Sequence, residues 1–269
     1  MISFVGAGPG APDLITLRGA DRLARAEVVV WASSLVPEAV LDHCRAGVVL
    51  HDSATMTLED VTAVYGSHPE GTAIVRLHSG DPSIYGAIAE QIAWCEANRR
   101  RWEIVPGVTS VSAAAAVVGR ELTVPGVSQS VVVTRLAGRT RASVPEGEGV
   151  AAFAPHATTM AVLLSGARPD ELQAELLADG SGYRPDTPAV VVVRATWPDQ
   201  QVLATTVGQV AETIRASGAT MTLLVLVGDA LAEGAPVRRS HLYAPEFSTT
   251  YRLPSRGGST AGRPSARRR

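Results

Sequence analysis

The sequence is poor in aromatic residues and cysteine, and its charges nearly cancel. Only 4% of the 269 residues are Phe, Trp or Tyr, and the formal net charge is −2. A protein with so small a net charge lacks the strongly charged surface that attracts nucleic acid or a membrane. The composition therefore excludes charge-driven binding to either. The two cysteines, Cys44 and Cys95, cannot form a disulfide framework. We therefore expect reduced thiols in a cytoplasmic protein.

Long hydrophobic runs and a basic leader are also missing. No apolar run approaches the roughly 20 residues of a membrane span. The chain starts directly with an apolar segment, Met1–Val5, which lacks the basic start of a signal peptide. The six histidines show no metal-ligand spacing, so no protein-bound metal is expected. The sequence also contains neither a Walker A motif nor a G-x-S-x-G nucleophile elbow.

Short apolar runs alternate with segments of helical spacing along most of the chain. Apolar residues make up 46% of the sequence, which is ample for a sizeable core. This alternation predicts two α/β domains, each a mostly parallel or mixed sheet with helices on both faces. We expect an N-terminal domain over 1–134, a Gly/Pro-rich junction over 135–157, a C-terminal domain over 158–252 and a disordered Arg-rich tail over 253–269.

The most informative segment is a turn, His78–Gly86, between a predicted strand and a predicted helix that starts at Ala87. Such turns expose backbone groups to ligands in open α/β sheets. Gly80 allows a conformation or a close approach that a Cβ would forbid, and Pro82 stiffens the turn. Asp81 adds an acceptor at its mouth. The alternative is an ordinary loop, because Gly, Asp and Pro are common in loops.

A second Gly/Pro-rich turn, Gly6–Asp13, matches the loose dinucleotide fingerprint with Gly6, Gly8 and Ala11. The full signature also requires an acidic residue at the end of the second strand, which here reads Trp31–Ser33. Prolines at positions 9 and 12 remove two amide donors from the turn. An NAD(P)-binding protein is therefore the alternative interpretation. Without an obvious acid or base, the chain suits a reaction whose cosubstrate carries its own leaving group.

Several segments resemble the tetrapyrrole methylases. The family's N-terminal signature and two further turns correspond to Val5–Thr16, Gly80–Pro82 and Val105–Ser110. Other segments resemble one branch of the family, the precorrin-4 C11-methyltransferases. These segments are Glu121–Pro125, Ser128–Arg135 with Gly138–Thr140, and Arg194–Asp199. The resemblance extends from Met1 to about Arg252. Ser79 and Ser83 differ from the Thr and Ala common in relatives, and Arg139–Val144 carries extra residues.

The resemblance implies two α/β domains with a ligand trough between them, S-adenosylmethionine as cosubstrate and a corrinoid tetrapyrrole substrate. It also implies a homodimer without nucleic-acid or membrane partners. The expected cofactor contacts are Pro9, Ser79, Gly80, Asp81, Ile84, Thr109, Ser110, Leu164 and Ala195. We expect Asp81 to be catalytic by facing the cationic end of the donor. Glu90 is the candidate for taking the substrate proton, with a purely structural carboxylate as its alternative. Another ring-carbon methylase of the corrin pathway and a non-catalytic tetrapyrrole-binding module also stay open.

Overall fold

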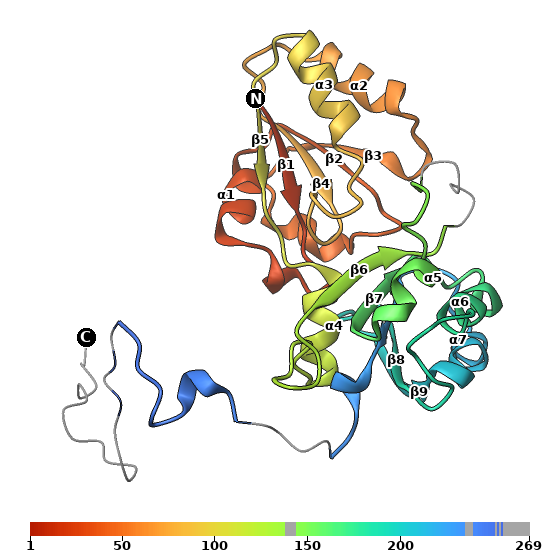
Figure 1. Cartoon of the computed structure of the whole chain (residues 1–269). Helices are drawn as coiled ribbons and strands as arrows, with labels where there is room; N and C mark the ends of the chain where they lie inside the picture. Colours follow the sequence, from red (N-terminus) through yellow and green to blue (C-terminus); the bar gives the residue numbers. More distant parts are fainter. Residues whose placement is uncertain (138–143, 235–238, 251, 253, 255–269) are drawn as a thin grey trace.

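The computed structural model describes residues 1–137, 144–234, 239–250, 252 and 254. Two five-stranded sheets form two domains, the N-terminal one above the C-terminal one in Figure 1. The first sheet is parallel throughout, with the order β3-β2-β4-β1-β5. Its strands are β1 (Ile2–Gly6), β2 (Val28–Trp31), β3 (Val49–Asp52), β4 (Ile74–His78) and β5 (Trp102–Val105).

Helices cover both faces of this sheet because its strands are apolar at successive positions. In β2, Val29 packs on one face with Leu23, whereas Val28 and Val30 pack on the other face with Tyr65. This is the continuous apolar pattern of a parallel sheet that is buried on both sides. One face carries α1 (Leu17–Arg25) and the 3₁₀ helix η2 (Glu38–His43); the other carries α2 (Leu58–Ser67) and α3 (Ala89–Ala97).

Two threonines begin helices of this domain through side-chain caps. Thr16 Oγ1 accepts a hydrogen bond from the Gly19 amide at 3.1 Å and starts α1. Thr57 and Asp60 form a reciprocal capping box at the start of α2. Each cap provides an acceptor for a backbone amide that the first turn of the helix leaves without an intrahelical partner.

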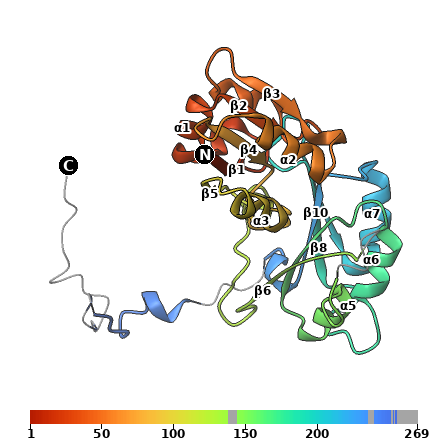
Figure 2. The same ribbon diagram turned by 90° about the horizontal axis from the view of Figure 1, so that it is seen from above.

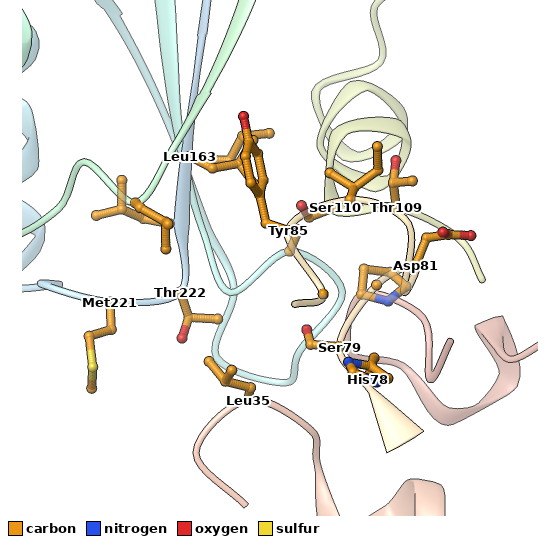
Figure 3. A pocket seen from close by; sticks show the side chains of 18 of the residues that line it. Leu35, His78, Ser79, Asp81, Tyr85, Thr109, Ser110, Leu163, Met221 and Thr222 are labelled. Carbon is orange, nitrogen blue, oxygen red and sulfur yellow. The ribbon is translucent and has the colours of Figure 1, made fainter. Parts of the chain in front are cut away.

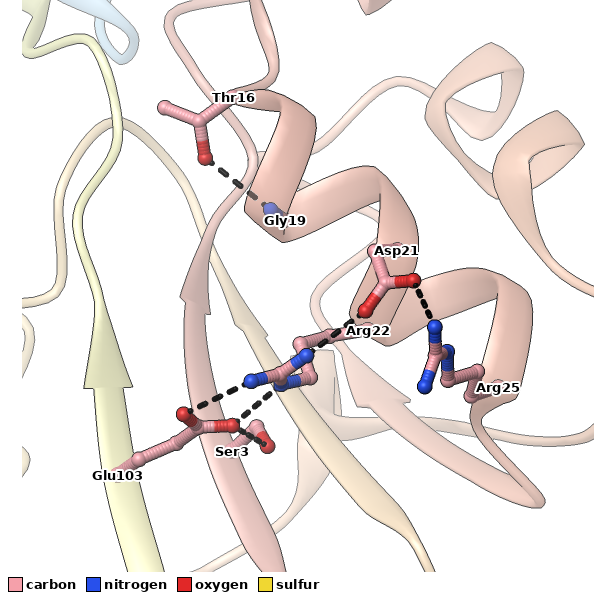
Figure 4. A network of polar contacts seen from close by, with 7 residues as sticks. All are labelled: Ser3, Thr16, Gly19, Asp21, Arg22, Arg25 and Glu103. Carbon is pink, nitrogen blue, oxygen red and sulfur yellow. Dashed lines mark hydrogen bonds and ion pairs between the residues drawn. The ribbon is translucent and has the colours of Figure 1, made fainter.

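A polar network ties α1 to β1 and β5 (Figure 4). The Arg22 guanidinium donates to Glu103 at 2.5 Å, and the Ser3 hydroxyl donates to the same carboxylate at 2.8 Å. Arg22 also pairs with Asp21, which in turn pairs with Arg25. The hydrogen bond from Arg22 is the main reason that the pKa of Glu103 lies below its ordinary value, against a smaller opposing effect of burial.

The second sheet is mixed, with the order β6-β7-β10-β8-β9. Only the β6–β7 pair is parallel, since β10 runs antiparallel to both its neighbours and β8–β9 is also antiparallel. Its strands are β6 (Val131–Arg135), β7 (Thr159–Leu163), β8 (Pro188–Val193), β9 (Gln201–Thr206) and β10 (Leu223–Val227). The helices on one face are α5 (Val150–Phe153), α6 (Pro169–Leu176) and α7 (Val210–Ser217). Figure 2 shows α6 beside α7 on this face.

The boundary between the domains lies earlier than the expected residue 134. Helix α4 (Ser110–Val118) packs on the free face of the second sheet, where Val111 and Ala114 contact its apolar side chains. Strand β6 also belongs to that sheet. The chain therefore passes from one domain to the other directly after β5, and residues 110–134 belong to the second domain. The expected tail falls outside the described residues except for Pro254, so its disorder stays a prediction.

Three further findings refer only to the residues that the structure describes. None of its helices combines the length and apolar character that a membrane crossing requires. Cys44 and Cys95 are both free thiols, and Cys95 is buried. No cluster of three or more His, Cys, Asp or Glu side chains is arranged to hold a metal ion.

Candidate functional site

Three turns meet at the carboxyl edge of the first sheet, where β1 and β4 lie side by side. The chain leaves β1 toward the face of α1 and leaves β4 toward the face of α3, so the edge between them is a topological switch point. Gly8 and Gly80 join the first two turns by two backbone hydrogen bonds of 3.2 and 2.8 Å. The third turn, Pro106–Thr109, lies against both.

Glycine is required in these turns for two different reasons. A Cβ on Gly6 would lie 2.6 Å from Gly107 Cα, and one on Gly107 would lie 2.2 Å from the Gly80 carbonyl oxygen. Gly80 itself has φ +65°, but a Cβ there would meet nothing closer than 3.7 Å. The structure therefore shows the left-handed conformation that was one of the two roles expected for Gly80, and its close approach to a donor stays a prediction.

Asp81 clamps two of the turns together. Its Oδ1 accepts hydrogen bonds from the Ser83 amide at 2.8 Å and from the Ser83 hydroxyl, and its Oδ2 accepts one from the Gly107 amide at 2.8 Å. Burial opposes the charge of this residue, which is 8% exposed, but these hydrogen bonds prevail and lower its pKa. Both oxygens are thus used within the protein, and the expected contact with a cationic donor stays a prediction.

The turns open into a cavity of about 460 Å³ that is lined from both domains. Figure 3 shows Thr109 and Ser110 on one side of it and Met221 and Thr222 on the opposite side. All nine residues expected to contact the cofactor line this cavity: Pro9, Ser79, Gly80, Asp81, Ile84, Thr109, Ser110, Leu164 and Ala195. Glu90 does not line it, because this residue is exposed in the first turn of α3. The structure brings the nine together, and their contact with a donor stays a prediction.

The turn after β4 is longer and more strained than the sequence predicts. Helix α3 begins at Ala89 instead of Ala87, because Tyr85 and Ala87 have left-handed backbones with φ of 55° and 49°. A Cβ on Gly86 would lie 2.1 Å from the Pro82 carbonyl oxygen, so the chain turns tightly here. Leu164 and Thr222, which also line the cavity, have φ of 55° as well. Strained backbone of this kind clusters at ligand sites.

A loop of the second domain packs against the first turn beside the cavity, which Pro9 and Ala195 line. The Trp197 indole donates to the Pro9 carbonyl oxygen at 3.0 Å, and Thr196 Oγ1 accepts from the Ala11 amide at 3.0 Å. Gly10 is required beneath the indole, because a Cβ there would lie 2.3 Å from Trp197 Cδ1. We call these residues, 9–11 and 196–197, the Trp197 latch.

Arg194 supports the latch from within its own loop. Its guanidinium carbon lies 4.0 Å from the centre of the Trp197 ring, and its Nε pairs with Asp199 at 2.9 Å. Stacking and ion pairing together hold the indole toward the first domain. A second link between the domains is the interaction of the Tyr85 hydroxyl with the side chain of Thr134.

The expected site residues did not include two basic residues that line the cavity, Arg76 and His78. Both lie in β4, at alternate positions of one face. Burial and then the Arg76 charge lower the pKa of His78 to about 3, so this imidazole is neutral. A charged residue within an otherwise apolar strand was the available signal, since buried arginine is rare without a role.

Comparison with known proteins decides the family. The model of the Tetrapyrrole (Corrin/Porphyrin) Methylases matches residues 1–211. The chain belongs to the tetrapyrrole methylase family. It is 43% identical to the precorrin-4 C(11)-methyltransferase of Rhodococcus erythropolis, over 90% of this chain and 96% of that protein. It is 40% identical to the cobalt-precorrin-4 C(11)-methyltransferase of Methanocaldococcus jannaschii, over 93% of this chain and 95% of that protein.

Solved structures of tetrapyrrole methylases have the same fold. The X-ray structure of a cobalt-precorrin-4 methyltransferase aligns with a TM-score of 0.81 at 40% identity, over 86% of this chain and 95% of that one. The uroporphyrin-III C-methyltransferase of Thermus thermophilus, complexed with S-adenosylhomocysteine, aligns with a TM-score of 0.67 at 27% identity, over 86% and 98%. These likenesses confirm the predicted fold class and the resemblance to the family.

Proposed function

We propose that the protein is an S-adenosylmethionine-dependent methyltransferase that methylates C11 of precorrin-4 or cobalt-precorrin-4 in cobalamin biosynthesis. The observation that carries the proposal is the cavity. Nine residues assigned to the methyl donor from sequence resemblance line one space between the domains. The identity of 43% with a precorrin-4 C(11)-methyltransferase over nearly the whole length supports the position of methylation.

The cavity fits a donor of this chemistry. Its volume of about 460 Å³ lies in the range of small-molecule sites. Its lining is mostly apolar, with hydroxyls from Ser79, Thr109 and Ser110 and exposed backbone groups at the turn edges. Polar groups on rigid turns can orient the nucleoside and amino-acid ends, while the apolar walls exclude water.

The transfer needs little covalent participation from the protein. The donor's S–CH₃ bond breaks as the new bond to C11 forms, the sulfonium becomes a neutral thioether and the substrate loses one proton. Because charge is lost at sulfur, a dry cavity with fixed dipoles favours the transition state over the hydrated cation. The residues of this chain therefore bind the donor and the substrate, align the methyl group with C11 and exclude water from the cavity.

The proposed enzyme acts on a corrinoid as a homodimer in the cytoplasm, without nucleic-acid or membrane partners. The family resemblance supports the dimer, and sedimentation of the purified chain measures it. The small net charge of −2 supports the absence of charge-driven partners.

Methyl-labelled S-adenosylmethionine tests the function directly. Incubation with metal-free or cobalt-bound precorrin-4 should place one labelled methyl on C11, as mapped by NMR of the product. The faster substrate of the two identifies the physiological form. Label on another ring carbon would favour a different methylase of the corrin pathway. Label that stays on the donor with both substrates present would overturn the enzymatic proposal in favour of a binding module.

A further inference from the structure

Arg76 is a partly buried cation in the wall of the cavity. It lies in β4 between the buried residues Val75 and Leu77. Its Nη1 donates to Ser53 Oγ at 2.8 Å and to the Val30 carbonyl oxygen at 3.3 Å. Its Nε is buried without a partner. All hydrogen bonds of this guanidinium to described residues run through Nη1, which leaves Nη2 for a ligand.

The charge of Arg76 is not balanced within the described part of the chain. No ion pair there includes it, in contrast to Arg22, which binds two carboxylates. Desolvation lowers its pKa, and no carboxylate offsets this effect. Burying an unpaired charge is costly, so such groups are ordinarily paired.

Neighbouring groups of the cavity do not supply the missing anion. Asp81, the acidic residue among the lining residues, uses both oxygens on Ser83 and Gly107. His78 is neutral and carries no charge to compensate. Arg76 is the one arginine among the described lining residues, and the chain contains no lysine. The cavity therefore contains one cationic side chain, Arg76, that no carboxylate of the described residues pairs with.

We propose that Arg76 binds a carboxylate, and that this is the carboxylate at the amino-acid end of the methyl donor. The inference rests on the proposed function. Guanidinium is the side chain best suited to carboxylate, because it is always charged and offers several donors in one plane. The acid side chains of a corrinoid offer the same chemistry. The donor is the better match because Arg76 lies within the sheet, bonded to β2, where a slender chain end enters more readily than a broad macrocycle.

Two ligands that differ in the amino-acid end separate these roles. S-adenosylhomocysteine carries the carboxylate, whereas 5′-methylthioadenosine has the same nucleoside and thioether without it. Loss of a charge-assisted contact weakens binding about 10- to 100-fold. By calorimetry, Arg76→Met should therefore weaken S-adenosylhomocysteine about 10- to 100-fold and leave methylthioadenosine within about twofold. Arg76→Lys should recover part of the lost affinity, since it restores the charge without the planar fork.

Arg100 provides a matched control in the same domain. It is 9% exposed, has buried nitrogens without partners and does not line the cavity. Arg100→Met should leave both affinities unchanged, and melting curves of all variants report whether each is folded. Equal weakening of both ligands by Arg76→Met would show a purely structural role and overturn the proposal.

Other outcomes distinguish the source of the carboxylate from the function itself. If Arg76→Met leaves the affinity for S-adenosylhomocysteine unchanged but raises the KM for the corrinoid, Arg76 binds an acid side chain of the macrocycle. That result would overturn the donor assignment. Unchanged affinity and unchanged KM would overturn any carboxylate role. Failure of the parent protein to bind S-adenosylhomocysteine would overturn the proposed function and this inference together. Failure of the Arg76 variants alone to show a selective loss would overturn only the inference.

Discussion

Asp81 illustrates how a single residue can hold the shape of a candidate site. The sequence places a carboxylate at the mouth of the turn after β4. In the structure one of its oxygens accepts from Ser83 of the same turn, and the other accepts from Gly107 of the next turn. The carboxylate accepts from two backbone amides and one hydroxyl, and in this way links the two turns. Its first task is therefore to hold the shape of the cavity wall.

Asp81→Asn tests this task. The amide retains one acceptor but directs an NH₂ group at a Ser83 or Gly107 donor, so at least one hydrogen bond is lost in a residue that is 8% exposed. We expect about 1–3 kcal/mol of lost stability and S-adenosylhomocysteine binding weakened about 10- to 100-fold. Denaturant unfolding and calorimetry measure the two effects. A variant with unchanged stability and affinity would show that Asp81 is not a clamp.

Glu90→Gln tests the expected proton acceptor. Glu90 is exposed outside the cavity lining, which favours the structural alternative. We expect the substitution to change kcat less than about threefold, whereas loss of a true general base lowers the rate about 100-fold or more. Steady-state kinetics with precorrin-4 decides between them. A large fall in kcat with unchanged donor affinity would restore Glu90 to the catalytic role.

Which residues of the cavity could be predicted depended on the kind of signal. Turn residues such as Pro9, Gly80 and Thr109 stand in recognisable Gly/Pro motifs, and all of them line the cavity. Arg76 and His78 lie within a strand, where a polar side chain carries no motif. Their contribution depends on which face of β4 meets the cavity, and spacing along one strand does not determine that.

At the scale of elements, the alternation of apolar runs with segments of helical spacing predicted the α/β class of the fold. Two errors have physical causes. Helix α3 starts late because strained residues such as Tyr85 extend the turn, and local propensity does not register such strain. Strand β6 was expected in the N-terminal domain but pairs with β7 of the second sheet. An apolar strand such as Val131–Arg135 fits either sheet, so its own sequence does not decide the assignment. Pairing is decided by contacts distant in sequence.

The Trp197 latch joins a loop of the second domain to the turn after β1, beside the cavity. Trp197→Phe keeps an aromatic ring for Arg194 to stack on but removes the donor to the Pro9 carbonyl oxygen. Loss of one neutral hydrogen bond corresponds to about 0.5–1.5 kcal/mol. We therefore expect donor affinity about 2- to 10-fold weaker by calorimetry. Trp102→Phe, at a surface tryptophan of β5 that is 37% exposed, is the matched control. Equal affinity of parent and Trp197→Phe would show that the latch does not shape the donor site.

The network around Glu103 makes a pH-dependent contribution to stability. Its pKa is lowered in the folded protein, mainly by the hydrogen bond from Arg22. The contribution is therefore present above the ordinary pKa of 4.5 and is lost as the pH falls through the lower folded value. Because these side chains are about a quarter exposed and screened by solvent, Glu103→Gln should cost only about 0.5–1 kcal/mol at pH 7. Urea unfolding should show this difference shrinking below pH 4.5; a difference that grows in acid would contradict the assigned sign.

At the scale of the whole molecule, the two domains are joined by one chain crossing and by contacts around the cavity. The crossing lies at Pro106–Thr109, and the Trp197 latch and the Tyr85–Thr134 contact connect the domains on either side. The cavity is thus part of the interface between the domains. Family resemblance predicted a trough between two domains, but the position of the crossing required the pairing of β6.

Binding of the methyl donor should therefore stabilise both domains together. S-adenosylhomocysteine at about 100 times its Kd contributes about 2.7 kcal/mol by mass action, which in a chain of 269 residues raises the melting temperature by about 5–10 °C. Because Thr109 at the chain crossing and Leu164 and Ala195 in the second domain all line the cavity, scanning calorimetry should show every unfolding transition moving upward. NADPH at the same concentration should move none of them. A shift confined to one transition would place the donor within a single domain, and a shift with NADPH alone would reverse the choice between the two cofactors.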